Sequence, residues 1–416
     1  MPRWLRIALT ALLPILIVAA AMRLWFAWDY QRHLPHRALS AIPFLFESGN
    51  IATSLAKGQG FASPFRVETG PTAWMTPLYP LLLSFIMRVF GVYTYQSWVA
   101  AVLMNICFST VACVPVYFTG KRLGGTAVAA IAGWLWAIFP NAILLSFQSL
   151  WDTSLSALLG ISAVWATLRV VHSKRPLEWW GYGLLWGTAL MANASLLSLM
   201  PFLLGWAVWR TKDLRNGALA IGMVVLCCLP WTVRNYRVFR TFIPLRSVLG
   251  LQLWVGNNPD AKVVWLGEQH PIHDSSERDR YVQMGEIAYM QEKLHNSVDY
   301  IFTHPGHETE LILGRLVMFW AGGTPHPLTD FLHSHSARFR YVLIFNLCAA
   351  LGAVAGIVLL FVTHNAYAFP LAAGPLIFPF AYYMTLSLPR YRHPIDPTLM
   401  VLLAFAIWRA VPRGVR

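Results

Sequence analysis

Residues 152–194 read DTSLSALLGISAVWATLRVVHSKRPLEWWGYGLLWGTALMANA, and this stretch decides the class of protein. Two apolar runs, 152–171 and 179–194, flank the short basic loop HSKRP (172–176). A helix of roughly 20 mostly apolar residues crosses the hydrocarbon core of a bilayer. Short loops rich in Lys and Arg stay in the cytoplasm. We therefore expect two transmembrane helices joined by a loop on the inner side of a membrane.

The same alternation of apolar runs and basic loops continues through most of the chain. Hydrophobic residues make up 57% and charged residues 12% of the sequence, against about 25% charged residues in ordinary soluble domains. The pattern predicts an all-α polytopic membrane protein with about ten transmembrane helices and both termini in the cytoplasm. The other predicted spans are 7–28, 96–119, 126–146, 195–209, 217–233, 340–362, 366–388 and 394–411.

Two shorter apolar runs, 77–91 and 310–322, are predicted to lie at the membrane interface rather than to cross it. With 77–91 left uncrossed, the basic loops 120–125, 172–176 and 210–217 all fall on the inner side. The chain then divides into three regions by sequence. These are an N-terminal membrane region (residues 1–233) with a first outer loop 29–76, an outer-face segment 234–338 with interfacial helices, and C-terminal membrane helices 339–416.

The charge balance does not point to nucleic acid. The net charge of +14 comes from 32 Lys and Arg against 18 Asp and Glu, and the positive-inside bias accounts for much of it, with membrane lipids as partners. Motifs for nucleotide binding are missing, and the five Cys lie in apolar runs without metal-type spacing. The His residues that cluster late in the chain lack the spacing of a helical zinc site, and we interpret them as polar loop residues: His304, His307, His326, His333 and His335.

Two acidic residues stand out on the predicted outer face. Glu47 follows PFLF and opens an amphipathic stretch of the first outer loop, and Asp152 begins a transmembrane helix at its outer end. Asp152 could be a helix N-cap, and Glu47 could be a solvated loop residue. Alternatively, carboxylates at membrane level mark a site. If the two converge on one cleft, they could act as a general base and as a ligand of a divalent cation, with Asp152 as the candidate ligand.

Arginine residues gather at two places on the same face. The stretch PWTVRNYRVFRTFIPLRS (230–247) places four Arg just past an outward-going helix, against the usual charge bias. The motif LPRYRHPIDP (388–397) adds two more. Arg suits bidentate contacts to phosphate, and a lipid phosphate is the anion available at that depth; general contact with anionic head groups is the alternative. The predicted phosphate-binding residues are Arg234, Arg237, Arg246, Arg390 and Arg392.

Several motifs together resemble the GT-C membrane glycosyltransferases. They are ESGNIATSLAKGQGFASPF (47–65), GPTAWMTPLYPLLLSFIMRVFG (70–91) and SFQSLWDTSLSALL (146–159). More narrowly, the chain is similar to the bacterial branch with glycosyltransferase family 39, rhizobial lipopolysaccharide glycosyltransferases and aminoarabinose transferases. The resemblance implies a transmembrane glycosyltransferase module in residues 1–233 and a bacterial inner-membrane enzyme. Such an enzyme moves a sugar from a polyprenyl-phosphate donor to a glycan, lipid or protein acceptor on the periplasmic face.

The resemblance also implies roles for individual residues. Glu47 matches an outer acid that acts as base or metal ligand, although many relatives carry Asp there, and Asp152 matches a second outer acid. Near MANASLL many relatives carry a Lys that holds the donor phosphate, whereas this chain has Asn193. Asn193, Trp74 and Tyr79 are expected to contact substrate. A divalent cation is a possible cofactor, and the resemblance does not decide whether one is needed, because metal dependence varies within the superfamily.

Two other classes of function remain as alternatives. A transporter or lipid-linked glycan flippase needs polar groups along the membrane midplane and usually pseudo-symmetric halves, but mid-helix charges are few here and no internal repeat is visible. A polysaccharide polymerase or ligase has its large outer loop late in the chain. The long first outer loop therefore favours the transferase.

Overall fold

The computed structural model describes residues 3–33, 44 and 46–412. Residues 34–43 and 45 of the first outer loop and the terminal residues 1–2 and 413–416 lie outside the described residues. Within the described ranges, regular structure is helical, with one isolated antiparallel bridge between Ala62 and Pro71. The predicted all-α class is therefore confirmed for these residues.

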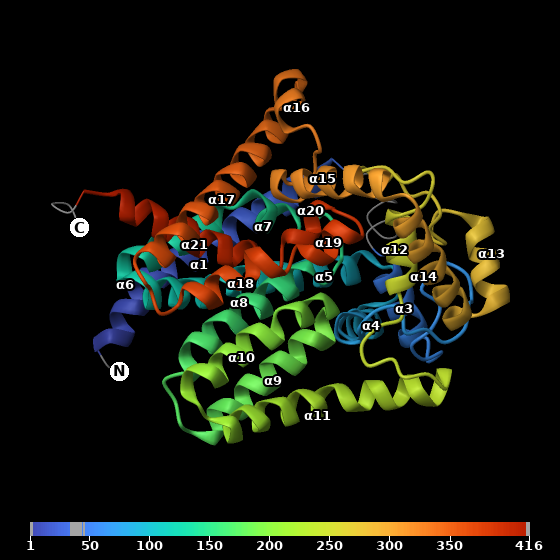
Figure 1. Ribbon diagram of the computed structural model, residues 1–416, viewed down its shortest axis with the longest axis horizontal. Coiled ribbons are helices and arrows are strands. Elements are labelled where there is room, and N and C mark those ends of the chain that lie inside the picture. The colour runs from blue at the N-terminus through green and yellow to red at the C-terminus, as the bar shows by residue number, and fades with distance from the viewer. Residues whose placement is uncertain (1–2, 34–43, 45, 413–416) are drawn as a thin grey trace.

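The helices pack into an elongated body, with a bundle of longer helices at one end and a group of shorter helices at the other (Figure 1). Their bounds are α1 (Arg3–Arg32), α3 (Glu47–Ala56), α4 (Leu78–Phe90), α5 (Tyr95–Val111), α6 (Cys113–Ile138), α7 (Pro140–Leu144), α8 (Thr153–Val170), α9 (Pro176–Ala192), the 3₁₀ helix η2 (Ala194–Ser198), α10 (Met200–Thr211), α11 (Leu214–Phe239), α12 (Leu249–Gly256), α13 (Ser275–Met284), α14 (Glu286–Thr303), α15 (Pro305–Ala321), α16 (Pro327–His333), α17 (Ala337–Val362), α18 (Ala368–Ile377), α19 (Phe380–Met384), α20 (Pro389–Arg392) and α21 (Asp396–Ala410).

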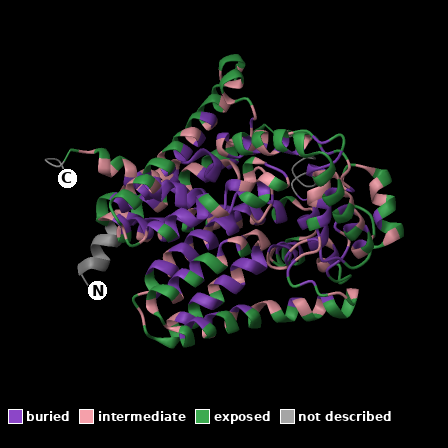
Figure 2. Cartoon of the chain, viewed as in Figure 1, coloured by how far each residue is buried: buried purple, intermediate pink, exposed green. Residues whose placement is uncertain are grey.

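Five helical segments of the described chain are long and apolar enough to cross a membrane: Ala11–Arg32, Tyr95–Ile138, Thr153–Val170, Leu214–Phe239 and Ala337–Val362. Helices α1, α11 and α17 bury only about a third or less of their apolar windows, and α11 is largely exposed along its length (Figure 2). Exposed apolar helix faces of this kind are what lipid covers. The remaining predicted spans correspond to the shorter apolar helices α9, α10, α18 and α21. The protein is therefore a polytopic membrane protein, and the helix count is compatible with about ten spans.

A two-glycine turn divides α6, so that the predicted spans 96–119 and 126–146 are separate helices. Gly124 and Gly125 leave the helical conformation, and Gly125 has a φ of 73°, which glycine adopts without strain. A Cβ atom on Gly120 would lie 3.0 Å from the Cα of Ala129. The two arms of α6 thus pack backbone to backbone beside the turn, which carries the basic residues Lys121 and Arg122 at its start.

The basic loops gather at one end of the molecule. The amide of Asn216, at the start of α11, donates to the carbonyl of Lys174 at 3.4 Å, which joins two of these loops. The loop between α17 and α18 lies beside them, because the hydroxyl of Tyr367 is 2.8 Å from the Nε2 of His172. In Figure 1 the turn between α10 and α11, the start of α1 and the end of α21 all lie toward the left, whereas α3, α4 and α12 to α14 lie at the right. The two ends of the long axis therefore differ: one end has the basic loops and the other has the shorter helices.

The predicted boundary at 233/234 differs from the structure. Helix α11 continues to Phe239, so Arg234 and Arg237 lie on its last turns and not in a loop beyond it. The predicted division at 233/234 consequently falls inside α11.

Helix α4 has 13 residues, which span about 20 Å at 1.5 Å per residue. That length is short of the roughly 30 Å hydrocarbon core, and the interfacial placement of 77–91 stays our interpretation.

Candidate active site

A cavity of about 520 Å³ lies at the end of the bundle opposite the basic loops. Its wall comes from the start of α3, the segment before α4, the start of α8, the end of α9, α12, the loop before α13 and the segment around α20. Six of the residues predicted from the sequence line it together: Glu47, Trp74, Asp152, Asn193, Arg246 and Arg390. The structure thus brings the two predicted acids to one cavity from positions more than 100 residues apart.

Glu47 is the first residue of α3, and its side chain is only 10% exposed. Its Oε1 lies 3.6 Å from the Nε2 of His270. Its Oε2 is buried without a hydrogen-bond partner among the described residues. Burial raises the pKa of the Glu47 carboxyl, and the positive charge of Arg390 opposes that shift. A buried carboxylate with a raised pKa is a stronger base than one in water.

Asp152 is the N-cap residue of α8 by position, as its sequence context allowed, but its side chain makes no capping hydrogen bond to the helix backbone. Its Oδ2 instead accepts hydrogen bonds from Asn193 Nδ2 at 2.8 Å and from Ser156 Oγ at 2.9 Å. Burial raises the pKa of Asp152, while the hydrogen bond from Ser156 and the charges of Arg390 and Arg246 act against it. The role of Asn193 that the structure shows is to orient this carboxylate.

Two arginines supply the positive charge of the cavity. The guanidinium of Arg390 lies 3.9 Å from the centre of the Trp151 ring, and Trp151 in turn contacts Phe46, with 4.9 Å between ring centroids. Arg246 donates to the Oε1 of Gln252 at 3.2 Å. Cation–π stacking orients a guanidinium without occupying its hydrogen-bond donors. Arg390 lines the cavity with a side-chain hydrogen bond to Tyr391, and its positive charge acts on both Glu47 and Asp152.

The other predicted site residues do not line the cavity. Arg234 donates to the carbonyls of Thr72 at 2.6 Å and Phe61 at 2.7 Å and so holds the first outer loop. Arg237 is exposed on α11. The remaining two are buried elsewhere: Arg392 pairs with Asp396 at 2.7 Å, and Tyr79 shares a hydrogen bond with Asn105. These four side chains contact other parts of the protein or lie on its surface. Their predicted depth in the membrane did not determine the direction in which each side chain points.

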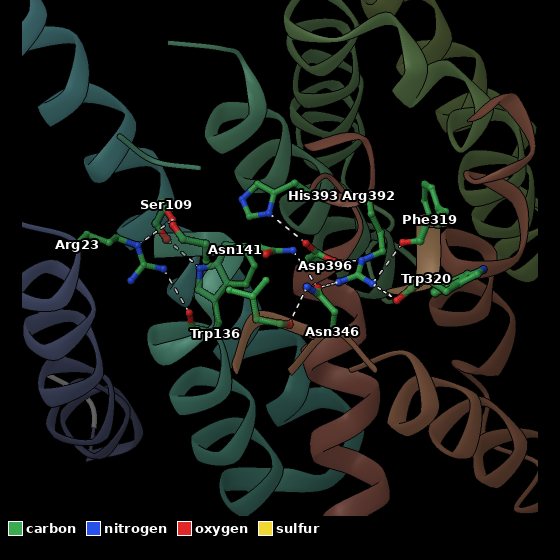
Figure 3. A network of polar contacts seen from close by, with 12 residues as sticks. Arg23, Ser109, Trp136, Asn141, Phe319, Trp320, Asn346, Arg392, His393 and Asp396 are labelled. Carbon is green, nitrogen blue, oxygen red and sulfur yellow. Dashed lines mark hydrogen bonds and ion pairs between the residues drawn. The ribbon is translucent and has the colours of Figure 1, made fainter. Parts of the chain in front are cut away.

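The segment that carries Arg390 is anchored by a buried polar network behind it (Figure 3). The Arg392 guanidinium donates to Asp396 and to the carbonyl of Trp320 at 2.7 Å, and it also contacts the amide of Asn346. Asp396 accepts a second contact from His393 at 3.1 Å. Helix α20 therefore turns one arginine into the core and the other into the cavity.

Sequence reasoning did not identify Glu286, which ties together the outer segments of the wall. Its carboxylate accepts hydrogen bonds from four groups: Thr72 Oγ1 at 2.5 Å, Ala73 N at 2.8 Å, Ser247 Oγ at 2.6 Å and Tyr281 OH at 2.7 Å. The flanking residues of two of these donors, Trp74 and Arg246, line the cavity. A single Glu in an amphipathic stretch gives no sequence signal for this role, because its partners are up to 214 residues away.

His270 also lines the cavity and was not identified from the sequence. It lies in the loop EQHPIHD, in which nothing distinguishes it from the other loop histidines. Its ring is placed by edge contacts to Trp74 and Trp265, each with 5.6 Å between ring centroids.

The cavity residues do not form a cation site of their own. In the described ranges, no group of three or more His, Cys, Asp and Glu side chains is arranged to hold a metal ion. The Oδ2 of Asp152 is occupied by two donors, and two arginine charges act on this carboxyl. Divalent cations prefer sites with several free oxygen ligands. The residues present therefore do not fit the predicted cation.

Comparison with known proteins identifies the fold. Residues 74–233 match the family described as dolichyl-phosphate-mannose-protein mannosyltransferase. No curated protein matches the sequence. Among solved structures, the apo oligosaccharyltransferase of Archaeoglobus fulgidus is similar with a TM-score of 0.57 and 13% identity, over 98% of this chain and 52% of that one. The same enzyme, AglB, in complex with an inhibitory peptide and a dolichol-phosphate gives a TM-score of 0.55 and 14% identity, over 96% and 50%.

A further match is ArnT from Cupriavidus metallidurans bound to undecaprenyl phosphate, with a TM-score of 0.40 and 13% identity, over 98% of this chain and 78% of that one. The chain spans about half the length of the oligosaccharyltransferase structures it matches. Another structure of that archaeal enzyme contains Zn and sulfate. The chain thus has the fold of the GT-C membrane glycosyltransferases, as its motifs predicted, and its residues 74–233 match the dolichyl-phosphate-mannose-protein mannosyltransferase family.

Proposed function

We propose that this protein is a glycosyltransferase that moves a sugar from a polyprenyl-phosphate donor to a glycan, lipid or protein acceptor on the outer face of a bacterial inner membrane. The observation that carries the proposal is the shared cavity, in which the carboxylates of Glu47 and Asp152 lie with the guanidinium groups of Arg246 and Arg390. Carboxylates suit sugar hydroxyls and proton transfer, whereas arginines suit a phosphate. The matched family and AglB, which was solved with a dolichol-phosphate, support a lipid-phosphate donor.

The proposed reaction uses each of these groups. The acceptor hydroxyl gives its proton to the Glu47 carboxylate as its oxygen forms a bond to the anomeric carbon of the sugar. The bond between that carbon and the phosphate oxygen breaks, and its electron pair leaves with the polyprenyl phosphate. Arg246 and Arg390 stabilise the charge that develops on the phosphate. Attack from the face opposite the phosphate inverts the configuration at the anomeric carbon.

Asp152 is proposed to bind the sugar rather than the proton. Asn193 and Ser156 hold its carboxylate in place at the entrance to α8. A fixed carboxylate accepts hydrogen bonds from neighbouring sugar hydroxyls in a defined orientation, which brings the anomeric carbon toward the base. Aromatic side chains in the wall, including Trp74, Trp151 and Tyr382, offer flat surfaces for the sugar ring or the prenyl chain.

Purified protein in lipid nanodiscs provides the test. A panel of synthetic polyprenyl-phosphate hexoses and pentoses is supplied with membrane lipids, glycans and peptides as acceptors, and free polyprenyl phosphate is measured. We expect release from at least one donor, lowered by roughly 10²–10⁴ in Glu47→Gln, and binding of polyprenyl phosphate alone at micromolar concentration. Absence of both turnover and polyprenyl-phosphate binding in a folded preparation would contradict the proposal.

A further inference from the structure

The tautomer of His270 is determined by its own loop. The backbone N–H of Ile272 donates to the Nδ1 of His270 at 3.2 Å. An imidazole nitrogen that accepts a hydrogen bond carries no proton, so the proton of the neutral ring is on Nε2. The Nε2–H is the atom that faces the Oε1 of Glu47 at 3.6 Å. The separation is a few tenths of an ångström beyond hydrogen-bond distance, and catalytic hydrogen bonds are often this long before substrate binds.

The surroundings keep His270 neutral. The side chain is 13% exposed and is flanked by the rings of Trp74 and Trp265. Burial lowers the pKa of His270 to about 3, and the charges of His273 and Arg390 lower it as well. His273 and Arg390 act on the pair through their charges, and the other charged and titratable groups of the same cavity are Asp152, Arg246, Tyr382 and Tyr391. At neutral pH His270 is a neutral donor and not a counter-ion.

We propose that His270 is a positioning residue, which donates its Nε2–H to the carboxylate of Glu47 and holds this base deprotonated and oriented toward the acceptor hydroxyl; the inference rests on the proposed function. The ring cannot pass the proton onward, because its second nitrogen is occupied by the Ile272 N–H. The loop between α12 and α13 thereby completes a base whose carboxylate comes from α3, more than 200 residues earlier in the chain.

Two amide variants of His270 test the roles of the two ring nitrogens separately. His270→Gln can place an N–H near the position of Nε2, whereas His270→Asn can only reproduce the acceptor at Nδ1. Loss of a donor to a carboxylate raises the pKa of that carboxyl, so the base stays protonated up to a higher pH. In His270→Asn we expect kcat to fall about tenfold and the acid limb of the kcat/KM profile to move up by about one pH unit. The KM for the lipid donor should change by less than about twofold, because the donor is held elsewhere.

In His270→Gln we expect kcat within about threefold of the unaltered protein and an acid limb that does not move. His295→Asn, an exposed position of α14 outside the cavity, is the matched control. An unshifted acid limb in His270→Asn, or equal losses in the Asn and Gln variants, would overturn the positioning role. An unaltered protein that binds no polyprenyl phosphate and transfers no sugar would instead overturn the proposed function, and with it the inference that depends on it.

Discussion

Glu47 illustrates how burial converts an ordinary acid into a candidate base. The carboxyl lies at the first turn of α3, with its pKa raised by burial and lowered in part by Arg390. We predict that Glu47→Gln lowers turnover by roughly 10²–10⁴, because the amide keeps the shape of the side chain but accepts no proton. Donor affinity should stay nearly constant. The measurement is single-turnover transfer together with polyprenyl-phosphate binding, and near-normal transfer would remove Glu47 from the role of base.

The same residue sets the expected pH dependence. A base must be deprotonated to act, and its raised pKa moves the pH at which it loses its proton upward from the usual range of a Glu. Activity of the unaltered protein should therefore rise with pH through this raised value and level off above it. A kcat/KM profile that shows no acid limb above the ordinary Glu range would contradict the assignment.

Two arginines of the cavity can be compared with one outside it. Arg246→Ala and Arg390→Ala each remove a charge that faces Asp152, whereas Arg237→Ala removes an exposed charge of α11. Loss of a charge-assisted hydrogen bond costs roughly 1.5–3 kcal/mol, or about tenfold or more in affinity. We expect the donor KM to rise by this factor in the first two variants only. An equal effect of Arg237→Ala would mean that the arginines act through lipid head groups in general.

At the scale of elements, the buried network of Figure 3 fixes where α20 and α21 lie. Asp396 is fully buried and pairs with Arg392 and His393. Removing one partner of a buried ion pair leaves an uncompensated charge, which costs about 3–5 kcal/mol. Asp396→Asn should therefore lower the melting temperature in detergent markedly, whereas Asp260→Asn, on an exposed loop, should not. An unchanged melting temperature in Asp396→Asn would show that the network adds little to stability.

The elements also show what could be predicted from the sequence. Apolar run length located the five described segments that are long and apolar enough to cross a membrane, because lipid excludes exposed polar groups. The direction of individual side chains could not be predicted in this way. Arg390 and Arg392 are two residues apart, yet one faces the cavity and the other is buried beside Asp396. His270 and Glu286 gave no signal because their partners are distant in sequence, and only tertiary packing brings them together.

At the scale of the whole molecule, the difference between its two ends predicts how the protein is oriented in the membrane. The loops that contain Lys174 and Asn216 meet at one end, and the cavity lies at the other. Because short basic loops stay in the cytoplasm, the cavity end should face outward and both termini inward. A polyprenyl-phosphate donor would then reach the cavity laterally from the membrane on a side where no nucleotide sugar is present.

Cysteine labelling in intact bacteria tests this orientation. In a variant without the five native Cys, a single Cys replaces Glu68, Asp260 or Lys174, all of which are exposed. A membrane-impermeant maleimide should label positions 68 and 260 from outside and position 174 only after permeabilisation. The opposite pattern would place Glu47, Asp152 and the arginines at the cytoplasmic surface. Since the cavity and the basic loops are fixed at opposite ends of one bundle, a single labelled position on each side is enough to decide between the two orientations.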